Sequence, residues 1–125
     1  MEEEPKGEMT IRTLAMPADT NPAGDVFGGW IMSQMDIAGN LVSKRVAKGR
    51  TVTIAVDGMN FHKPVFVGDT VCCYTEVTRV GNTSITIHVE TWATRQYSTE
   101  RLKVTEGNFT FVAVDENRKP RNIES

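Results

Sequence analysis

A glycine pair, Gly28-Gly29, stands where a loop of turn-forming residues passes into a hydrophobic helix, and an acid, Asp36, follows two turns later. The N-terminus of a helix carries backbone N–H groups without internal partners, so it stabilises negative charge on an oxygen. A carboxylate near that oxygen can activate water or attack a carbonyl carbon itself. These residue types, in this order, predict a site that holds and attacks a carbonyl group.

Asp36 is the acid on which this interpretation depends. Helical spacing places it on the same side of the helix as Gly29 and Ser33. The flanking Met35 and Ile37 predict that it is buried inside the fold, and a buried acid needs a partner or a task. The alternative is a solvent-exposed acid on an otherwise apolar helix.

The residues around Asp36 also have two interpretations each. Gly28 and Gly29 either allow a sharp turn and tight packing or offer their N–H groups to an oxyanion, and both roles can hold together. One such donor is commonly worth ~10²–10³ in rate. Asn21 either shapes the loop, as a turn residue does, or polarises a carbonyl and orients water.

The composition places the chain among ordinary globular proteins. Its 125 residues predict one domain, and 39% hydrophobic and 24% charged residues allow one core. A net charge of −2 and a pI near 5.7 argue against nucleic acid as the main partner. No apolar run reaches ~18 residues, so no membrane span is expected.

The ends and the cysteines bear on the compartment. Residues 1–8 are expected to be a disordered lead-in, and their acidic start has no signal-peptide core. Cys72 and Cys73 are adjacent in an expected strand, so their side chains point to opposite faces and should not pair. Without a disulfide framework, the predicted location is cytoplasmic.

The periodicity predicts an α+β fold with one long central helix wrapped by a curved antiparallel sheet. The helix is expected from about Gly28 to Lys48, with Gly49 as its stop; because it is apolar nearly all round, we expect the sheet to enclose it. Gly81-Asn82 predicts a short hairpin turn. The strands are expected at Met9–Met16, Thr51–Asp57, Met59–Phe61, Thr70–Val80, Thr83–Gln96 and Leu102–Asp115.

Several other chemistries lack their motifs. His62 and His88 have no acid or nucleophile beside them in sequence, and no G-x-S-x-G elbow is present. The spacing of His and Cys predicts no metal site. The G-D-V-F-G-G stretch is neither a dinucleotide fingerprint nor a P-loop.

Element order and motifs together resemble a hotdog-fold acyl-CoA thioesterase, most closely the bacterial YciA-like group. The resemblance covers residues 11–123 and is carried by M-P-A-D-T-N-P-A-G-D-V-F-G-G-W-I-M-S-Q-M-D (16–36), with M-N-F-H-K-P-V-F-V-G-D (59–69), V-G-N-T-S (80–84) and F-T-F-V-A-V-D (109–115) in support. Proteins of this group often carry a further C-terminal helix, which the resemblance leads us to expect short or absent in this sequence. Residues 9–125 are accordingly expected to form a single domain of this kind.

The resemblance implies a homo-oligomer, a dimer or a trimer of dimers, with active sites at the dimer interface. Asp36 would be the catalytic acid, Gly28 and Gly29 would hold the oxyanion, and Asn21 would come from the partner subunit. Coenzyme A would lie across a groove made by both chains. No cofactor or metal is implied, because a thioester is already activated.

Residues that could bind the substrate are less specific. The turn containing Gly81, Asn82 and Ser84 can offer backbone and hydroxyl donors to the phosphates of coenzyme A. Ser33 and Lys63 are further candidates, although most basic residues of the second half are expected to be solvated.

The function expected from the sequence is hydrolysis of acyl-CoA to free coenzyme A and a carboxylic acid, with Asp36 as general base or nucleophile. The alternative is a non-catalytic acyl-CoA-binding protein of the same fold. A dehydratase acting on acyl thioesters is a third option. Such an enzyme needs a catalytic histidine near the helix start, and the sequence has no histidine there.

Overall fold

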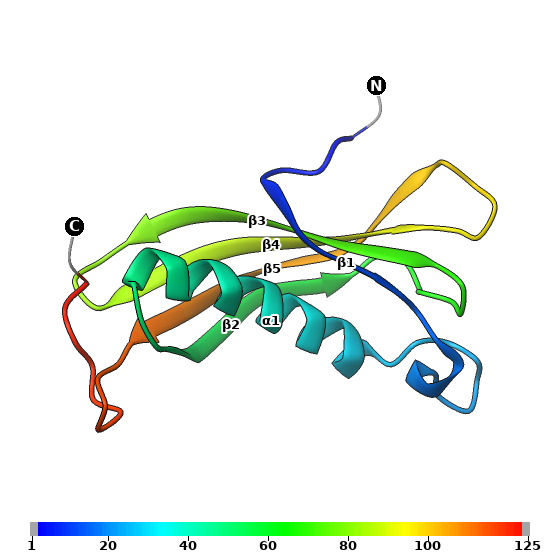
Figure 1. Cartoon of the computed structure of the whole chain (residues 1–125). Helices are drawn as coiled ribbons and strands as arrows, with labels where there is room; N and C mark the ends of the chain where they lie inside the picture. Colours follow the sequence, from blue (N-terminus) through cyan, green and yellow to red (C-terminus); the bar gives the residue numbers. More distant parts are fainter. Residues whose placement is uncertain (1–2, 124–125) are drawn as a thin grey trace.

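The computed structural model of the chain describes residues 3–123. Residues 1–2 of the expected lead-in and residues 124–125 of the expected domain lie outside the described residues. One long helix, α1, crosses one face of a five-stranded antiparallel sheet with the strand order β1-β3-β4-β5-β2 (Figure 1). The elements in chain order are β1 (Glu8–Leu14), the 3₁₀ turn η1 (Pro17–Asp19), α1 (Gly28–Ala47), β2 (Thr51–Phe61), β3 (Thr70–Val80), β4 (Ser84–Thr94) and β5 (Arg101–Ala113).

The core lies between α1 and the face of the sheet that the helix covers. Alternate residues of β4 and β5 point to this face, and Ile85, Ile87, Phe109 and Phe111 are buried there. From the helix, Met35 packs into the same cluster. One apolar layer between a helix and a curved, unclosed sheet is the α+β arrangement predicted from the sequence.

The helix approaches the sheet most closely at Gly39. A Cβ added at this residue would lie 2.7 Å from the ring of Phe111 and 3.9 Å from the Cβ of Phe109. Because real Cβ atoms do not come so close to a ring, only glycine fits at this position. The helix therefore rests directly on the aromatic residues of β5.

The prediction that the sheet encloses the helix is wrong for the single chain. Met32, Ile37 and Leu41 are 37%, 49% and 36% exposed, and Asp36 between them is half-buried rather than buried. The physical reason is that five strands curl over only one side of the helix. Its opposite side, apolar as the sequence indicates, has no cover within the described residues.

Element boundaries also differ from the expectation. The ends of β1, β4 and β5 lie one or two residues from the expected positions, and two other boundaries differ for a physical reason. The strands expected at Thr51–Asp57 and Met59–Phe61 form one strand, β2, because Gly58, at φ 69°, absorbs a bulge in its pairing with β5. The residue that ends α1 in the left-handed conformation is Lys48, at φ 55°, rather than Gly49.

Gly49 has a different function at that end of the helix. Arg121 Nη2 donates to the Ala47 carbonyl oxygen at 2.8 Å, and Arg121 Nε donates to the Val114 carbonyl oxygen at 3.1 Å. A Cβ on Gly49 would lie 2.5 Å from Arg121 Nη2. The missing side chain therefore lets a guanidinium reach the negative end of the helix.

The expectations for the two cysteines and for the hairpin turn are confirmed. Cys72 and Cys73 are both free and buried, and burial raises the pKa of the Cys73 thiol to about 11. Gly81 N–H donates to the Ser84 carbonyl oxygen at 2.7 Å and closes the predicted hairpin between β3 and β4. No helix among residues 3–123 is long and apolar enough to cross a membrane.

Residues 3–7 run from the start of β1 across the outer face of the sheet. The Lys6 backbone N–H donates to Glu90 Oε1 at 3.2 Å, and Glu3 pairs with Lys103 Nζ at 3.0 Å. A Cβ at Gly7 would lie 2.2 Å from the Thr75 carbonyl oxygen, so the chain passes very close to β3. The division into a disordered lead-in and a single domain stays a prediction.

Replacing Gly39 by alanine should lower the stability of the fold. Alanine favours a helix by ~1 kcal/mol over glycine, but overpacking a core against a buried ring costs about 1–3 kcal/mol. We expect the overpacking to win, because the Phe111 ring is fully buried and has no free space to enter. Urea unfolding at fixed protein concentration measures the difference.

Gly29→Ala, in the same helix, is the matched control, because a Cβ there meets nothing within 4 Å. Its stability should equal or slightly exceed that of the wild type. Equal stability of Gly39→Ala and the wild type would contradict the contact with Phe111 as the reason for the glycine.

Candidate active site

The N-terminus of α1 is left without a cap by its own chain. Phe27 occupies the N-cap position and makes no side-chain capping hydrogen bond. The Trp30 and Ile31 N–H groups donate to the Phe27 carbonyl oxygen at 3.1 and 3.3 Å, whereas the Gly28 and Gly29 N–H groups have no acceptor among residues 3–123. Two backbone donors at the positive end of a helix are therefore available to an external oxygen.

No contact within the described chain requires these two residues to be glycine. Neither has a positive φ, and a Cβ at Gly29 would meet nothing within 4 Å. A Cβ at Gly28 would touch only the Phe61 ring, at an ordinary 3.6 Å. The space that the missing side chains leave is therefore open and faces away from the core.

Asn21 lies close to this helix terminus. Its Oδ1 accepts hydrogen bonds from the Ala23 N–H at 2.9 Å and from the Asp25 N–H at 3.1 Å, which shapes the loop before the helix. The carbonyl end of the amide is thus used for the turn, and Nδ2 is the end left to donate to another group. Loop shaping and carbonyl binding use different atoms of the same side chain.

Asn21, Gly28 and Lys63 line one hollow of about 390 Å³. Val26, Ile31 and Val65 are buried behind it and supply apolar walls, with the half-exposed Phe61 at its side. Its remaining lining residues are Asp25, His62 and Pro64. The hollow therefore combines the bare Gly28 N–H donor, an amide and a cation with an apolar wall.

Asp36 is held by a residue that the sequence analysis did not identify. Thr53 Oγ1, on β2, donates to Asp36 Oδ1 at 2.6 Å. One turn further along α1, Asn40 Nδ2 donates to Thr51 Oγ1 at 3.1 Å, and Ser43 and Thr51 share a hydroxyl hydrogen bond of 2.6 Å. One carboxylate oxygen is fixed in this way, and Oδ2 is left for chemistry.

These hydrogen bonds form a polar seam between α1 and β2, and its spacing is visible in the sequence. Asp36 and Asn40 lie four residues apart on the helix, a rise of ~6 Å. Thr51 and Thr53 lie two residues apart on the strand, a rise of ~6.6 Å. Polar residues with matching spacing on two packed elements can pair, although sequence alone did not say that these two elements are neighbours.

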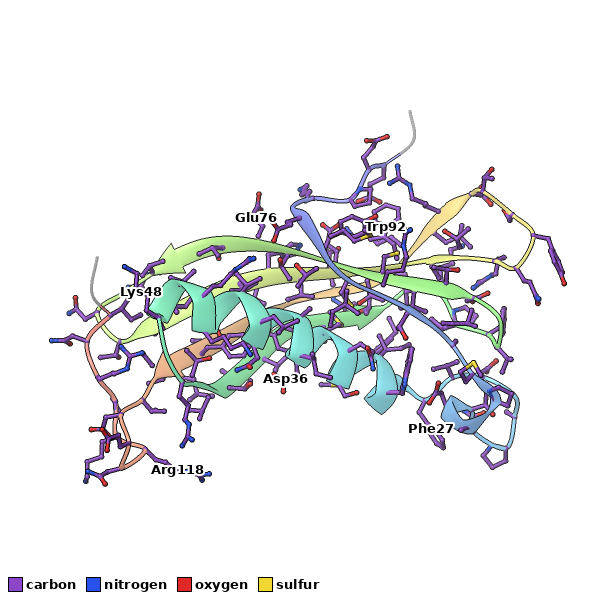
Figure 2. The ribbon with its side chains drawn as sticks, viewed as in Figure 1. Phe27, Asp36, Lys48, Glu76, Trp92 and Arg118 are labelled. Carbon is purple, nitrogen blue, oxygen red and sulfur yellow. The ribbon has the colours of Figure 1, made fainter. Side chains whose placement is uncertain are left out.

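The structure does not bring all the predicted catalytic residues together in one chain. Asp36 is eight residues beyond Gly28, a rise of ~12 Å along the helix. It lies midway along α1, whereas Phe27 marks the bare N-terminus (Figure 2). A carbonyl bound at the Gly28 and Gly29 N–H groups is thus out of reach of the same chain's Asp36.

The predicted substrate-binding residues also separate. Lys63 belongs to the hollow, and Ser33 is exposed on the helix with its Oγ donating to the Trp30 carbonyl oxygen at 2.9 Å. Gly81, Asn82 and Ser84 form the turn at the opposite end of the molecule, beside the C-terminus of α1 (Figure 1). His62 follows the end of β2 and lies in the hollow together with Gly28, although the two residues are 34 positions apart in the sequence. The sequence analysis did not predict this proximity.

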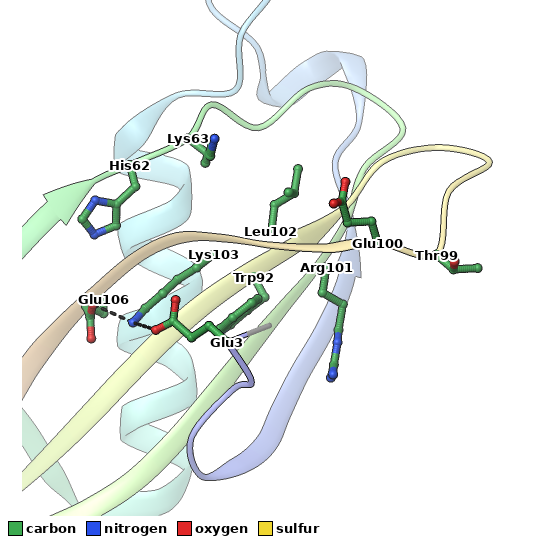
Figure 3. A pocket seen from close by; sticks show the side chains of 10 residues that line it. All are labelled: Glu3, His62, Lys63, Trp92, Thr99, Glu100, Arg101, Leu102, Lys103 and Glu106. Carbon is green, nitrogen blue, oxygen red and sulfur yellow. Dashed lines mark hydrogen bonds and ion pairs between the residues drawn. The ribbon is translucent and has the colours of Figure 1, made fainter. Parts of the chain in front are cut away.

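A larger hollow of about 780 Å³ lies on the other side of Lys63, between the end of β4, the start of β5 and the segment before β1 (Figure 3). Its most buried cation, Lys103, already pairs with Glu106 at 2.7 Å and with Glu3 at 3.0 Å. Although larger, this hollow does not contain the bare helix terminus, which the smaller hollow does. The smaller hollow is therefore the candidate for the carbonyl-binding part of the site.

The outer face of the sheet carries the one group of side chains with metal-ligand spacing among residues 3–123: His88, Glu90 and Glu106. His88 Nε2 lies 3.2 Å from a carboxylate oxygen of each glutamate. The Lys103 ammonium, within 4 Å of both carboxylates, already balances part of their charge. The cluster lies far from α1 and takes no part in the site described above.

Glu90 is the buried member of this cluster. Burial alone would raise the pKa of its carboxyl, but hydrogen bonds from Trp92 Nε1 at 2.9 Å, from the Lys6 N–H and from His88, together with the charge of Lys103, hold that pKa below its ordinary value of 4.5. The ionised form is therefore the one that the fold stabilises.

Comparison with known proteins identifies the class to which this fold and helix terminus belong. Residues 23–99 match the family described as the thioesterase superfamily. A hexameric hotdog fold thioesterase of Campylobacter jejuni is 44% identical, with a TM-score of 0.88 over 94% of this chain and 91% of that one. The chain belongs to the thioesterase superfamily and has the hotdog fold.

Within that class the similarity extends over almost the whole chain. The acyl-CoA thioester hydrolase YciA of Salmonella typhimurium is 53% identical over 126 residues, which cover 98% of this chain and 95% of the relative. The hexameric thioesterase of Yersinia pestis is 56% identical, with a TM-score of 0.93 over 98% of this chain and 99% of that one. The resemblance to the YciA-like group is confirmed.

Replacing Glu90 by glutamine should destabilise the fold at neutral pH and make it less sensitive to acid. A carboxylate whose pKa is lower in the folded protein than in the unfolded chain, where it is near 4.5, stabilises the fold at pH values above the unfolded-state pKa. This stabilisation is lost as the pH falls through the pKa of the folded state. Loss of charged, buried hydrogen bonds costs about 1–3 kcal/mol.

Urea unfolding at pH 7 and at pH 3.5 measures both effects at one protein concentration. The gap between wild type and Glu90→Gln should be wide at pH 7 and narrow at pH 3.5. Glu116→Gln, at an exposed loop position, should match the wild type at both pH values. A gap that widens in acid would contradict the assignment.

Proposed function

We propose that the chain hydrolyses acyl-CoA thioesters to coenzyme A and a carboxylic acid. The observation that carries the proposal is the uncapped start of α1, where the Gly28 and Gly29 N–H groups have no acceptor among residues 3–123 and Gly28 lines a hollow. The high identity to a named acyl-CoA thioester hydrolase supports the same substrate class. The bare donors match an oxygen that gains negative charge during the reaction.

The proposed mechanism assigns each group by its geometry. The thioester carbonyl oxygen accepts hydrogen bonds from the Gly28 and Gly29 N–H groups, with Asn21 Nδ2 as a further donor. Oδ2 of the partner subunit's Asp36 takes a proton from water, while the hydrogen bond that Thr53 donates to Oδ1 within each chain fixes the carboxylate plane. Attack of the hydroxide forms a tetrahedral oxyanion, and its collapse expels the thiolate of coenzyme A.

Direct attack by Asp36 on the carbonyl carbon is the second route by which this site could work, because Oδ2 is free for either task. It would form an anhydride on the protein, which water then hydrolyses. Repeated turnover in ¹⁸O-labelled water separates the routes, since only the anhydride route leaves the label in Asp36.

The site is proposed to be shared between two chains. The ~12 Å rise between Gly28 and Asp36 prevents one chain from supplying both. A two-fold axis that brings the partner subunit's Asp36 beside Gly28 passes beside the helix at the level midway between these two residues, next to Met32. Met32, 37% exposed, lies on the side of α1 that the sheet leaves uncovered.

The same two-fold contact covers the apolar surface that a single chain exposes. Ile37 and Leu41 on α1 are 49% and 36% exposed, and they lie beside β2, an edge strand of the sheet. An unpaired edge strand beside an apolar helix face is a surface that pairs with a second copy. The named hexameric relatives support three such dimers in one assembly.

The free cysteines support a reducing, cytoplasmic location for the protein.

The first test of this function is thiol release from acyl-CoA by wild type and Asp36→Ala. Loss of a general base costs ~10²–10⁴ in rate, and the half-exposed position of Asp36 should let the variant fold normally. Asp57→Ala, an exposed acid on β2, is the matched control and should keep the wild-type rate. If Asp36→Ala kept the wild-type rate, Asp36 would not be the catalytic acid. If the wild type bound acyl-CoA without releasing thiol, the non-catalytic alternative would be favoured.

A second test examines whether the site is shared. Asn21→Ala and Asp36→Ala are each expected to be nearly inactive, because the residues act as a unit. When the two variants are unfolded and refolded together, a hybrid dimer contains one site with both substitutions and one intact site. Activity should reappear at up to about half the wild-type level per hybrid dimer.

Mass spectrometry of differently tagged chains confirms that hybrids have formed. A mixture that contains hybrids and is no more active than either parent would contradict the shared site. Refolding each variant alone is the control for recovery of folded protein.

A further inference from the structure

Three side chains on the outer face of the sheet direct polar atoms toward one another. His88 and Glu90 lie two residues apart on β4 and so project from the same face, and Glu106 lies directly opposite Glu90 on β5. Trp92, which bonds to Glu90, lies on the side of the sheet away from α1 (Figure 2). The candidate ligand atoms of His88, Glu90 and Glu106 all lie within 4.8 Å of one another. We name these three residues the outer-face cluster.

Asn108 determines which nitrogen of His88 can bind an ion. It lies directly opposite His88 on β5, and its Oδ1 is 3.1 Å from His88 Nδ1. An amide oxygen only accepts hydrogen bonds, so Nδ1 is the nitrogen that carries the proton and donates. In the neutral ring a lone pair then remains on Nε2, which faces a carboxylate oxygen of each glutamate at 3.2 Å. Three electron-pair donors converge at this point, so a cation between them is needed to make the arrangement favourable.

The two glutamates are held by their other oxygens. Glu90 Oε1 accepts hydrogen bonds from Trp92 Nε1 at 2.9 Å and from the Lys6 N–H at 3.2 Å. Glu106 Oε2 pairs with Lys103 Nζ at 2.7 Å (Figure 3). Hydrogen-bonded supports behind each ligand are usual at metal sites, where they fix the direction of the ligand atoms. Glu90 Oε2 and Glu106 Oε1 are therefore left to face the imidazole nitrogen.

The charges around the cluster do not balance without a further cation. The Lys103 ammonium lies within 4 Å of carboxylate oxygens of Glu3, Glu90 and Glu106. Three carboxylates against one ammonium leave two negative charges uncompensated. Glu76, opposite the histidine on β3, adds a further acid to this face. Like charges directly opposite each other in a sheet are destabilising, and one divalent ion would supply the missing positive charge.

The spacing of the three atoms fits a metal ion better than a proton. A proton on His88 Nε2 would make a charge-assisted N–H···O bond, which is typically ~2.7–2.9 Å long and points at one acceptor. Here both carboxylate oxygens lie at the same 3.2 Å from the nitrogen. Zinc–nitrogen and zinc–oxygen bonds of ~2.0–2.2 Å place neighbouring ligands of a tetrahedral site about 3.3–3.5 Å apart. The observed distances are close to that separation.

We propose that the outer-face cluster binds one divalent transition-metal ion, through His88 Nε2, Glu90 Oε2 and Glu106 Oε1. Zinc is the ion that this ligand set suits best, because calcium and magnesium prefer oxygen ligands alone and copper(I) prefers sulfur. The ion would join β4 to β5 and, through Glu90 and the Lys6 N–H, steady the segment before β1. None of its ligands belongs to the proposed active site.

Isothermal titration of zinc chloride into chelator-stripped protein tests the proposal. The wild type should bind a single ion per chain. His88→Gln and Glu106→Gln should each weaken binding by more than ~100-fold, because loss of an outer support alone costs ~10–100-fold. Asn108→Ala, which removes such a support, should fall within that smaller range.

His62→Gln is the matched control for these variants. It removes the other histidine of the chain, which is exposed and lies outside the cluster, so it should bind zinc as the wild type does. Circular dichroism confirms that each variant is folded. The Glu106 side chain is 32% exposed, so Glu106→Gln, together with Asn108→Ala, decides the proposal if His88→Gln fails to fold.

A wild type that binds no zinc, wild-type affinity in any folded variant of the three, or an equal loss in His62→Gln would overturn the proposal. A ¹⁵N NMR spectrum that shows a proton on His88 Nε2 in the presence of excess zinc would also overturn it, because the proton and the ion compete for one lone pair. These measurements use no acyl-CoA, so a negative result leaves the proposed function untouched.

Discussion

The rest of the molecule depends on how closely α1 rests on the sheet at Gly39. With no side chain at this position, the helix backbone lies directly against the Phe111 ring. The polar seam between α1 and β2 needs this closeness, because Thr51 and Thr53 have short side chains and make hydrogen bonds of 2.6 Å to the helix. A helix raised by one methyl group would stretch these contacts, so packing in the core determines how firmly the carboxylate of Asp36 is held.

The one-sided cover of the helix is the reason why the proposed mechanism uses two chains. Five strands are enough to bury one face of α1, and the face that they leave open is apolar at Met32, Ile37 and Leu41. The donors lie at the start of the helix, and the acid lies midway along it. A symmetric contact along the open face therefore buries apolar surface and, in the proposed dimer, joins the two halves of the site in a single association step.

Most of the fold could be predicted because its signals are local. The helical period from Ile31 onward and the Gly81-Asn82 turn each depend on a few neighbouring residues, and both are confirmed. Thr53 bonds to Asp36, 17 residues earlier in the chain, and His62 lines the hollow with Gly28, 34 residues earlier. Neither position could be predicted, because both contacts depend on how distant elements pack together. The expected enclosure of the helix failed for a related reason: an apolar period shows that a surface is covered, but it does not show whether the cover comes from the same chain.

The uncapped start of α1 has a consequence for attempts to stabilise the protein. A serine or aspartate at the position of Phe27 would satisfy a free N–H group, and a cap of this kind is typically worth ~1 kcal/mol. The same side chain would occupy the space where the proposed mechanism binds the developing oxyanion. Consensus or computational redesign that rewards helix capping would thus trade turnover for thermostability at this one residue.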